Sequence, residues 1–233
     1  MTEIVELPRG IKKVAFDFDG VIGDTIPLHI EARIEAFNKF GIILNRDIHI
    51  EAHHHGASTF DIVSWAISQS QQESSPALVE QVIMLKNKLF YQLVAERSEP
   101  VKGIDALIDA CYKKFGKLII VTAELRQPME AALVRYGFSY MFDLELSVTN
   151  EDVDEACTKP DPKPYIIATE RMRVGSSEVF VFEDSIQGIQ SAKDAGCSVI
   201  GLDTTHTKEY LEDESEADKV MNVSEALELI SKH

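Results

Sequence analysis

Two aspartates lie one residue apart where an apolar run ends near the start of the chain. The run Val14–Phe16 leads into Asp17, Phe18, Asp19 and Gly20. Such a run predicts a buried strand, and residues two apart on a strand turn to the same side. Gly20 lets the chain leave the strand sharply. Two converging carboxylates repel each other, so we expect a cation between them, most simply Mg²⁺. The alternative is a loop whose acids face solvent.

Two more apolar runs end on reactive polar residues. One run ends at Thr122, and another ends at Glu183 and Asp184. Buried strands have no structural need for such endings. Because the carboxyl ends of parallel strands lie along one edge of a sheet, these residues and Asp17 are expected to share one site.

After Pro100 the chain alternates between strands and helices, and one further strand lies near its start. Apolar runs predict strands at 12–17, 117–122, 178–182 and 197–202, with a short one at 144–148. Between and after them, helical spacing and glycine stops predict helices at 103–115, 126–136, 160–173, 185–195 and 223–231. This alternation predicts an α/β fold, a Rossmann-like doubly wound parallel sheet. The acid-rich stretch 212–216 is expected to be a solvated loop.

A block of helices interrupts this pattern after the first strand. Apolar residues at helical spacing begin at Ile26 and again near Phe60, and Ser75-Pro76 opens a helix that runs to about Arg97. An insertion at this point would lie over the carboxyl ends of the strands, as a cap. We therefore expect an α/β core of residues 1–25 and 98–233 and a helical cap of residues 26–97.

Four stretches of the chain together resemble a known family. The first reads Asp-x-Asp-Gly-Val-x-x-Asp-Thr, and the stretches in order are Asp17–Thr25, Ile120–Ala123, Lys159–Pro162 and Phe182–Ala192. They resemble the motifs of the haloacid dehalogenase superfamily, in its β-phosphoglucomutase-like and phosphatase branch with a helical cap. Members are mostly Mg²⁺-dependent phosphatases and phosphomutases, so the resemblance implies phosphoryl transfer on this fold.

The resemblance assigns roles to the acids. It implies that Asp17 attacks phosphorus and becomes an aspartyl phosphate, while Asp19 acts as general acid and then as general base. It also implies that Mg²⁺ is held by Asp17, Asp184 and the main-chain carbonyl of Asp19. Glu183 is either a metal ligand through water or a residue that orients the ligands.

The resemblance likewise implies a phosphate site. Thr122, together with backbone N–H groups from Ala123 onward, would bind phosphate oxygens. Lys159 would balance the charge of nucleophile and phosphate. Gly188, in the fourth stretch, either allows close approach of its helix or is a tolerated helix glycine.

Two branches of the superfamily are less compatible with this sequence. The dehalogenases that attack carbon have a similar first motif that lacks the second aspartate. In this chain that aspartate, Asp19, is present. The mutase carries a Gly-x-Ser-Arg segment in its cap, whereas this chain has Thr59 in place of that arginine, after Gly56-Ala57-Ser58. Phosphatase activity is therefore favoured over mutase activity.

The cap holds the candidates for substrate selection. His29 and Lys86 resemble polar residues of the β-phosphoglucomutase-like cap that contact substrate, and the alternative for each is an ordinary helix residue. The run His53 to His55 suggests metal binding, but consecutive residues do not point to one centre in regular structure. The other interpretation is that at least one of these histidines faces the substrate from the cap.

Composition limits the partners. The chain has 233 residues and a formal net charge of −16, which repels nucleic acid and anionic membranes. Three scattered cysteines, Cys111, Cys157 and Cys197, indicate reduced thiols and a cytoplasmic location. Residues 1–10 have no apolar core of signal length. We expect a small phosphorylated metabolite as partner and a monomer or weak dimer.

The sequence thus predicts a Mg²⁺-dependent phosphatase acting on a small phosphorylated metabolite of the sugar or polyol class. One alternative is a β-phosphoglucomutase-like phosphomutase. The alternative from another class is a non-catalytic regulator that binds a phosphorylated ligand, against which the complete motifs argue.

Overall fold

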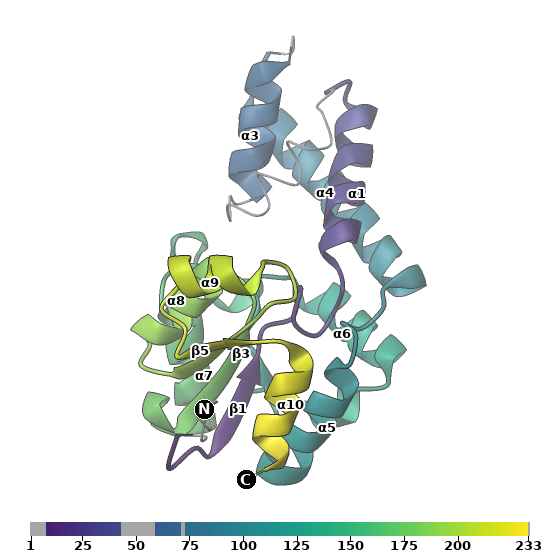
Figure 1. The fold of residues 1–233 in the computed structure, drawn as a ribbon. Helices are drawn as coiled ribbons and strands as arrows, with labels where there is room; N and C mark the ends of the chain where they lie inside the picture. The colour runs from purple at the N-terminus through teal and green to yellow at the C-terminus, as the bar shows by residue number, and fades with distance from the viewer. Residues whose placement is uncertain (1–7, 43–58, 71–72, 233) are drawn as a thin grey trace. The chain divides into compact units, whose positions relative to one another are not determined.

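The computed structural model describes residues 8–42, 59–70 and 73–232 (Figure 1). The chain divides into two compact units, Met1–Asp24 with Glu99–His233, and Thr25–Ser98. The first unit carries the sheet and the second is helical. No helix among the described residues combines the length and apolar character that a membrane span requires.

The first unit is built on a parallel sheet whose strand order is β2-β1-β3-β4-β5. The strands are β1 (Lys13–Phe16), β2 (Ile119–Ile120), β3 (Val179–Glu183), β4 (Ser198–Leu202) and β5 (Lys219–Met221). Ala15 of β1 lies opposite Ile119 of β2 and Val181 of β3. The strand that leads into Asp17 therefore lies between β2 and β3, whose ends carry the other reactive residues. This confirms the predicted α/β parallel sheet.

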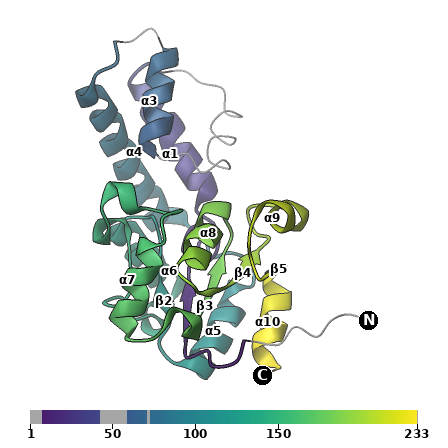
Figure 2. The ribbon, with the colours of Figure 1, turned by 90° about the vertical axis from the view of Figure 1, so that its left-hand side faces the viewer.

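Helices cover both faces of this sheet. They are α5 (Ile104–Phe115), α6 (Arg126–Tyr136), α7 (Lys163–Met172), α8 (Ile186–Asp194), α9 (Lys208–Glu214) and α10 (Val223–Ser231). Figures 1 and 2 show α5 and α10 side by side on one face, with α7 and α8 on the other. Because strand residues alternate in direction, Ala15 and Val181 pack toward α7 and α8, in one core cluster with Tyr165 and Ile189.

Three details differ from the sequence expectations. Residues 144–148 form no strand, because 144–146 turn, with the N–H groups of Leu146 and Ser147 donating to Asp143. Val148 still meets Val121 in an isolated bridge.

The other two differences lie near the C-terminus. Three of the five residues of the acid-rich stretch 212–216 belong to α9, which is capped by the Thr207 hydroxyl and anchored by the fully buried Leu211. The strand β5 was not predicted from the sequence. It has only three residues, which are too few to show a period of two.

The second unit consists, in its described part, of α1 (Ile26–Lys39), α3 (Thr59–Gln69) and α4 (Pro76–Arg97). The Ser75 hydroxyl accepts a hydrogen bond from the Leu78 N–H at 3.2 Å, and Pro76 occupies the first turn, as expected for this start of a helix. The helix α4 packs against both α1 and α3. Their shared core includes Phe37, Val63 and Val82.

Candidate active site

Three strand ends of the first unit meet at one side chain. Lys159 lies in the turn before α7, and its Nζ donates to Asp17 Oδ1 at 2.6 Å, to the Val121 carbonyl oxygen at 2.8 Å and to Glu183 Oε1 at 2.5 Å. An ammonium group has three protons, and each has an acceptor here. The Lys159 side chain is 8% exposed. Lys159 therefore ties together the ends of β1, β2 and β3.

Glu183 is the most enclosed acid of this cluster, with no exposed surface. Its Oε1 also accepts from the Tyr165 hydroxyl at 2.7 Å, and its Oε2 accepts from the Asp184 N–H at 3.2 Å. A Cβ on Gly188 would lie 2.1 Å from the Glu183 carboxyl carbon. Gly188 is therefore required for the close approach of α8 to this carboxylate. Of the two interpretations of Gly188, close approach is the correct one, and it is not merely a tolerated helix glycine.

Asp184 and Asp19 complete the acidic side of the site. Asp184 is buried and Asp19 is half-buried, in the turn where the N–H groups of Ile22 and Gly23 donate to the Phe18 carbonyl oxygen. Thr205, from the loop after β4, donates its hydroxyl to Asp184 Oδ2 at 2.6 Å. The chain thus brings Asp17, Asp19, Glu183 and Asp184 to one edge of the sheet.

The charges of this cluster do not balance. Burial raises the pKa of Asp17 well above its usual range, and the neighbouring carboxylates Glu183, Asp184 and Asp19 raise it further, while Lys159 lowers it. Burial and Glu183 likewise raise the pKa of Asp184. The pKa of Lys159 is raised because Asp17 and Glu183 outweigh the effect of its burial.

The same cluster fits a divalent cation. One ligand oxygen from each of Asp17, Glu183 and Asp184 lies within 4.8 Å of the others. In the described part of the chain, two of these three buried carboxyl groups, those of Asp17 and Glu183, contact one buried ammonium, Lys159. A hard divalent ion with oxygen ligands would neutralise the remaining charge.

Thr122 lies at the end of the neighbouring strand. Its N–H donates to the Val148 carbonyl oxygen at 2.9 Å, and its hydroxyl oxygen accepts from the Glu124 N–H at 3.0 Å. Ala123 is exposed, and α6 begins three residues later, at Arg126. Thr122 and Ala123 therefore lie in a short turn that leads into a helix N-terminus.

His29 and Lys86 belong to the second unit, where they meet at one aromatic ring. The His29 ring stacks on Phe90 with a centroid distance of 3.7 Å, and Lys86 Nζ lies 4.9 Å from the centroid of the same ring. Both residues are buried, as is Arg33, one turn after His29 on α1. The residues His53, His54 and His55 and the segment Gly56 to Ser58 lie outside the described residues.

Sequence reasoning missed two contacts in the first unit, those of Tyr165 and Thr205. Tyr165 reaches Glu183 from α7, and Thr205 reaches Asp184 from the loop after β4. A buried tyrosine needs a partner for its hydroxyl, which is a weak signal for Tyr165. Nothing in the sequence around Thr205 indicates its partner.

Comparison with known proteins assigns the family. A family profile described as haloacid dehalogenase-like hydrolase matches residues 14–202. The chain belongs to the haloacid dehalogenase-like hydrolases. The match spans Asp17, Thr122, Lys159 and Asp184, so the family and the clustered residues coincide.

Individual relatives of this haloacid dehalogenase-like hydrolase include phosphatases. A phosphorylated carbohydrates phosphatase of Thermotoga maritima is 28% identical over 196 residues, which are 80% of this chain and 82% of that protein. A fructose-1-phosphate phosphatase of Escherichia coli is 28% identical over 190 residues, 80% of this chain and 94% of that protein. The structure of CbbY from Rhodobacter sphaeroides in complex with phosphate has the same fold. Its TM-score is 0.79 at 23% identity, covering 94% of this chain and 100% of that one.

Proposed function

We propose that this chain is a Mg²⁺-dependent phosphatase that hydrolyses a small phosphorylated metabolite, a sugar or polyol phosphate, through an aspartyl phosphate on Asp17. The observation that carries the proposal is the Lys159 ammonium, which holds Asp17 Oδ1 at the edge of the sheet beside Glu183 and Asp184. The substrate class is supported by the names of the two phosphatase relatives.

The reaction divides into two steps on this site. In the first, a carboxylate oxygen of Asp17 bonds to phosphorus, the bond from phosphorus to the ester oxygen breaks, and Asp19 gives that oxygen its proton. In the second, water attacks phosphorus and gives its proton to Asp19, and the bond to Asp17 breaks to release phosphate. Asp19 returns to its starting protonation state at the end of the cycle.

The remaining residues position the reactants. Lys159 fixes the Asp17 carboxylate through Oδ1 and offsets negative charge beside the phosphate. The Thr122 hydroxyl accepts from Glu124, so its own proton can be donated to a phosphate oxygen. The turn at Ala123 adds main-chain N–H groups at the start of α6.

Mg²⁺ would be held by Asp17, Asp184 and the main-chain carbonyl of Asp19, and it would supply positive charge to the phosphate and the nucleophile. Glu183 suits the role of an orienting residue better than that of a ligand. Its Oε1 accepts from both Lys159 and Tyr165, and its Oε2 accepts from the Asp184 N–H. We infer that it holds Lys159 in place.

The function is tested by phosphate release from a panel of phosphorylated metabolites that includes fructose 1-phosphate, with p-nitrophenyl phosphate as a general substrate. We expect turnover with Mg²⁺ and loss of turnover in excess chelator, because the buried carboxylates then lack their cation. Full activity without a divalent ion would contradict the metal site. Absence of any phosphate release would favour the non-catalytic regulator, and formation of glucose 6-phosphate from β-glucose 1-phosphate would favour the mutase.

Substrate selection is proposed to reside in residues 26–97, with His29 and Lys86 as the contacts beyond the phosphate. Substitution His29→Phe is the sharpest test, because a phenyl ring can keep the stacking on Phe90 while it loses the ring nitrogens. Loss of one hydrogen bond to a polar group should lower kcat/KM for the preferred metabolite about five- to 150-fold. The value for p-nitrophenyl phosphate should stay near that of the wild type. Equal losses on both substrates, or none, would place selection elsewhere.

A further inference from the structure

Thr205 joins two loops of the first unit at the acidic edge of the sheet. It follows β4, and its Oγ1 lies 2.6 Å from Asp184 Oδ2 and 3.2 Å from the Asp184 carbonyl oxygen. An ionised carboxylate only accepts, so the threonine hydroxyl is the donor. A hydroxyl has one proton, and the shorter contact to the charged oxygen is the stronger one.

The main chain of Gly20 also lies close to this oxygen and to Thr205. A Cβ at Gly20 would lie 2.1 Å from Asp184 Oδ2 and 2.6 Å from the Thr205 methyl carbon, and Gly20 has a φ of +77°. Asp184 Oδ2 therefore has both the Gly20 main chain and the Thr205 hydroxyl as close neighbours. A hydrogen bond and a close main-chain neighbour at one oxygen restrict the rotation of the whole carboxylate.

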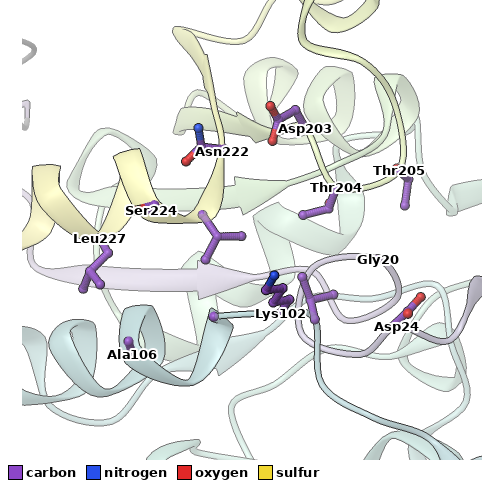
Figure 3. A pocket seen from close by; sticks show the side chains of 13 residues that line it. Gly20, Asp24, Lys102, Ala106, Asp203, Thr204, Thr205, Asn222, Ser224 and Leu227 are labelled. Carbon is purple, nitrogen blue, oxygen red and sulfur yellow. The ribbon is translucent and has the colours of Figure 1, made fainter.

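The Thr205 side chain also faces an open space. It lines a cavity of about 600 Å³ together with Gly20, Asp203 and Thr204 and the first residues of α5 and α10 (Figure 3). Asp17, Lys159 and Glu183 do not line this cavity. Because Thr205 is half-buried beside open space, packing alone does not explain why its hydroxyl is directed at Asp184.

We propose that Thr205 is a positioning residue for Mg²⁺, acting through Asp184 without touching the metal or the substrate. The inference rests on the metal site of the proposed function. Groups that hydrogen-bond a metal-ligating carboxylate set its orientation, and their loss typically weakens metal binding about 10- to 100-fold.

The test compares Thr205→Val with Thr205→Ser. Valine keeps the shape and removes the hydroxyl, whereas serine keeps the hydroxyl and removes the methyl group. Thr204→Val is the matched control, because its hydroxyl lies 3.5 Å from the Leu202 carbonyl oxygen, at the limit of a hydrogen bond, and it lines the same cavity. Mg²⁺ affinity is read, without substrate, from the rise of the thermal unfolding midpoint during a Mg²⁺ titration.

We expect Thr205→Val to bind Mg²⁺ about 10- to 100-fold more weakly, with Thr205→Ser and Thr204→Val close to the wild type. The Mg²⁺ concentration for half-maximal activity should rise in parallel for Thr205→Val, while kcat at saturating Mg²⁺ changes little. If Thr205→Val does not fold, Thr205→Ala replaces it in the same comparison.

Two results would overturn the inference while leaving the proposed function intact. One is unchanged Mg²⁺ affinity in Thr205→Val. The other is a lowered unfolding midpoint without Mg²⁺ and no change in the Mg²⁺ titration, as a purely structural hydroxyl would give. Failure of the wild type itself to bind Mg²⁺ would overturn both this inference and the metal site.

Discussion

Substitution Asp17→Asn is expected to lower phosphate release by more than about 10³-fold, because the amide cannot attack phosphorus. The fold should persist. Asparagine has the same shape, and its carbonyl oxygen can still accept from Lys159 at the position of Oδ1. The free energy of unfolding should not fall, since the change removes a buried carboxyl group whose pKa is raised by burial and by neighbouring acids.

The matched control for this change is Asp109→Asn, an exposed position on α5 whose carboxylate pairs with Lys113. Its phosphate release should equal that of the wild type. Steady-state assays with p-nitrophenyl phosphate and the best metabolite of the panel measure both variants. Near-normal turnover in Asp17→Asn would contradict the role given to this residue.

Substitution Lys159→Met is expected to have the largest effect on stability. The ammonium is buried between Asp17 and Glu183, so its removal leaves two buried carboxyl groups without their cation. Breaking a buried ion pair from one side costs about 3–5 kcal/mol. We expect a loss of that size in the free energy of unfolding of the metal-free protein, measured by urea titration, together with loss of phosphatase activity.

Lys193→Met provides the comparison at the surface. Lys193 Nζ lies 2.5 Å from Asp218 Oδ1, but the two side chains are 24% and 47% exposed. Solvent-exposed pairs contribute about 0–1 kcal/mol, so this variant should unfold near the wild-type urea concentration. If Lys159→Met is as stable as Lys193→Met, the buried ammonium does not hold the three strand ends together.

The strands that carry the reactive residues could be predicted because their signals are local. Residues 14–16 and 179–182 are continuous apolar runs, and a polar residue directly after such a run is visible without a structure. The place of Lys159 could not be derived this way, because it lies in a turn 142 residues after Asp17 and only the family resemblance indicated it.

Contacts made by tertiary packing were the least predictable. Tyr165 binds an acid 18 residues away, and Thr205 binds one 21 residues away. Neither spacing corresponds to a helix or strand period. Gly188 had two interpretations until the position of the Glu183 carboxylate was known. The strand β5 and the helix α9 were missed because each is short and is stabilised by its neighbours in the sheet unit.

The central claim is that Asp17 carries the phosphoryl group during turnover. The most direct measurement is rapid acid quenching of the enzyme during turnover with Mg²⁺ and a good substrate, followed by peptide mass spectrometry. The account predicts a phosphoryl group on Asp17 in the wild type, appearing before free phosphate reaches its steady rate, and none in Asp17→Asn. A phosphoryl group on another residue, or steady turnover with none on Asp17 at any quench time, would contradict it.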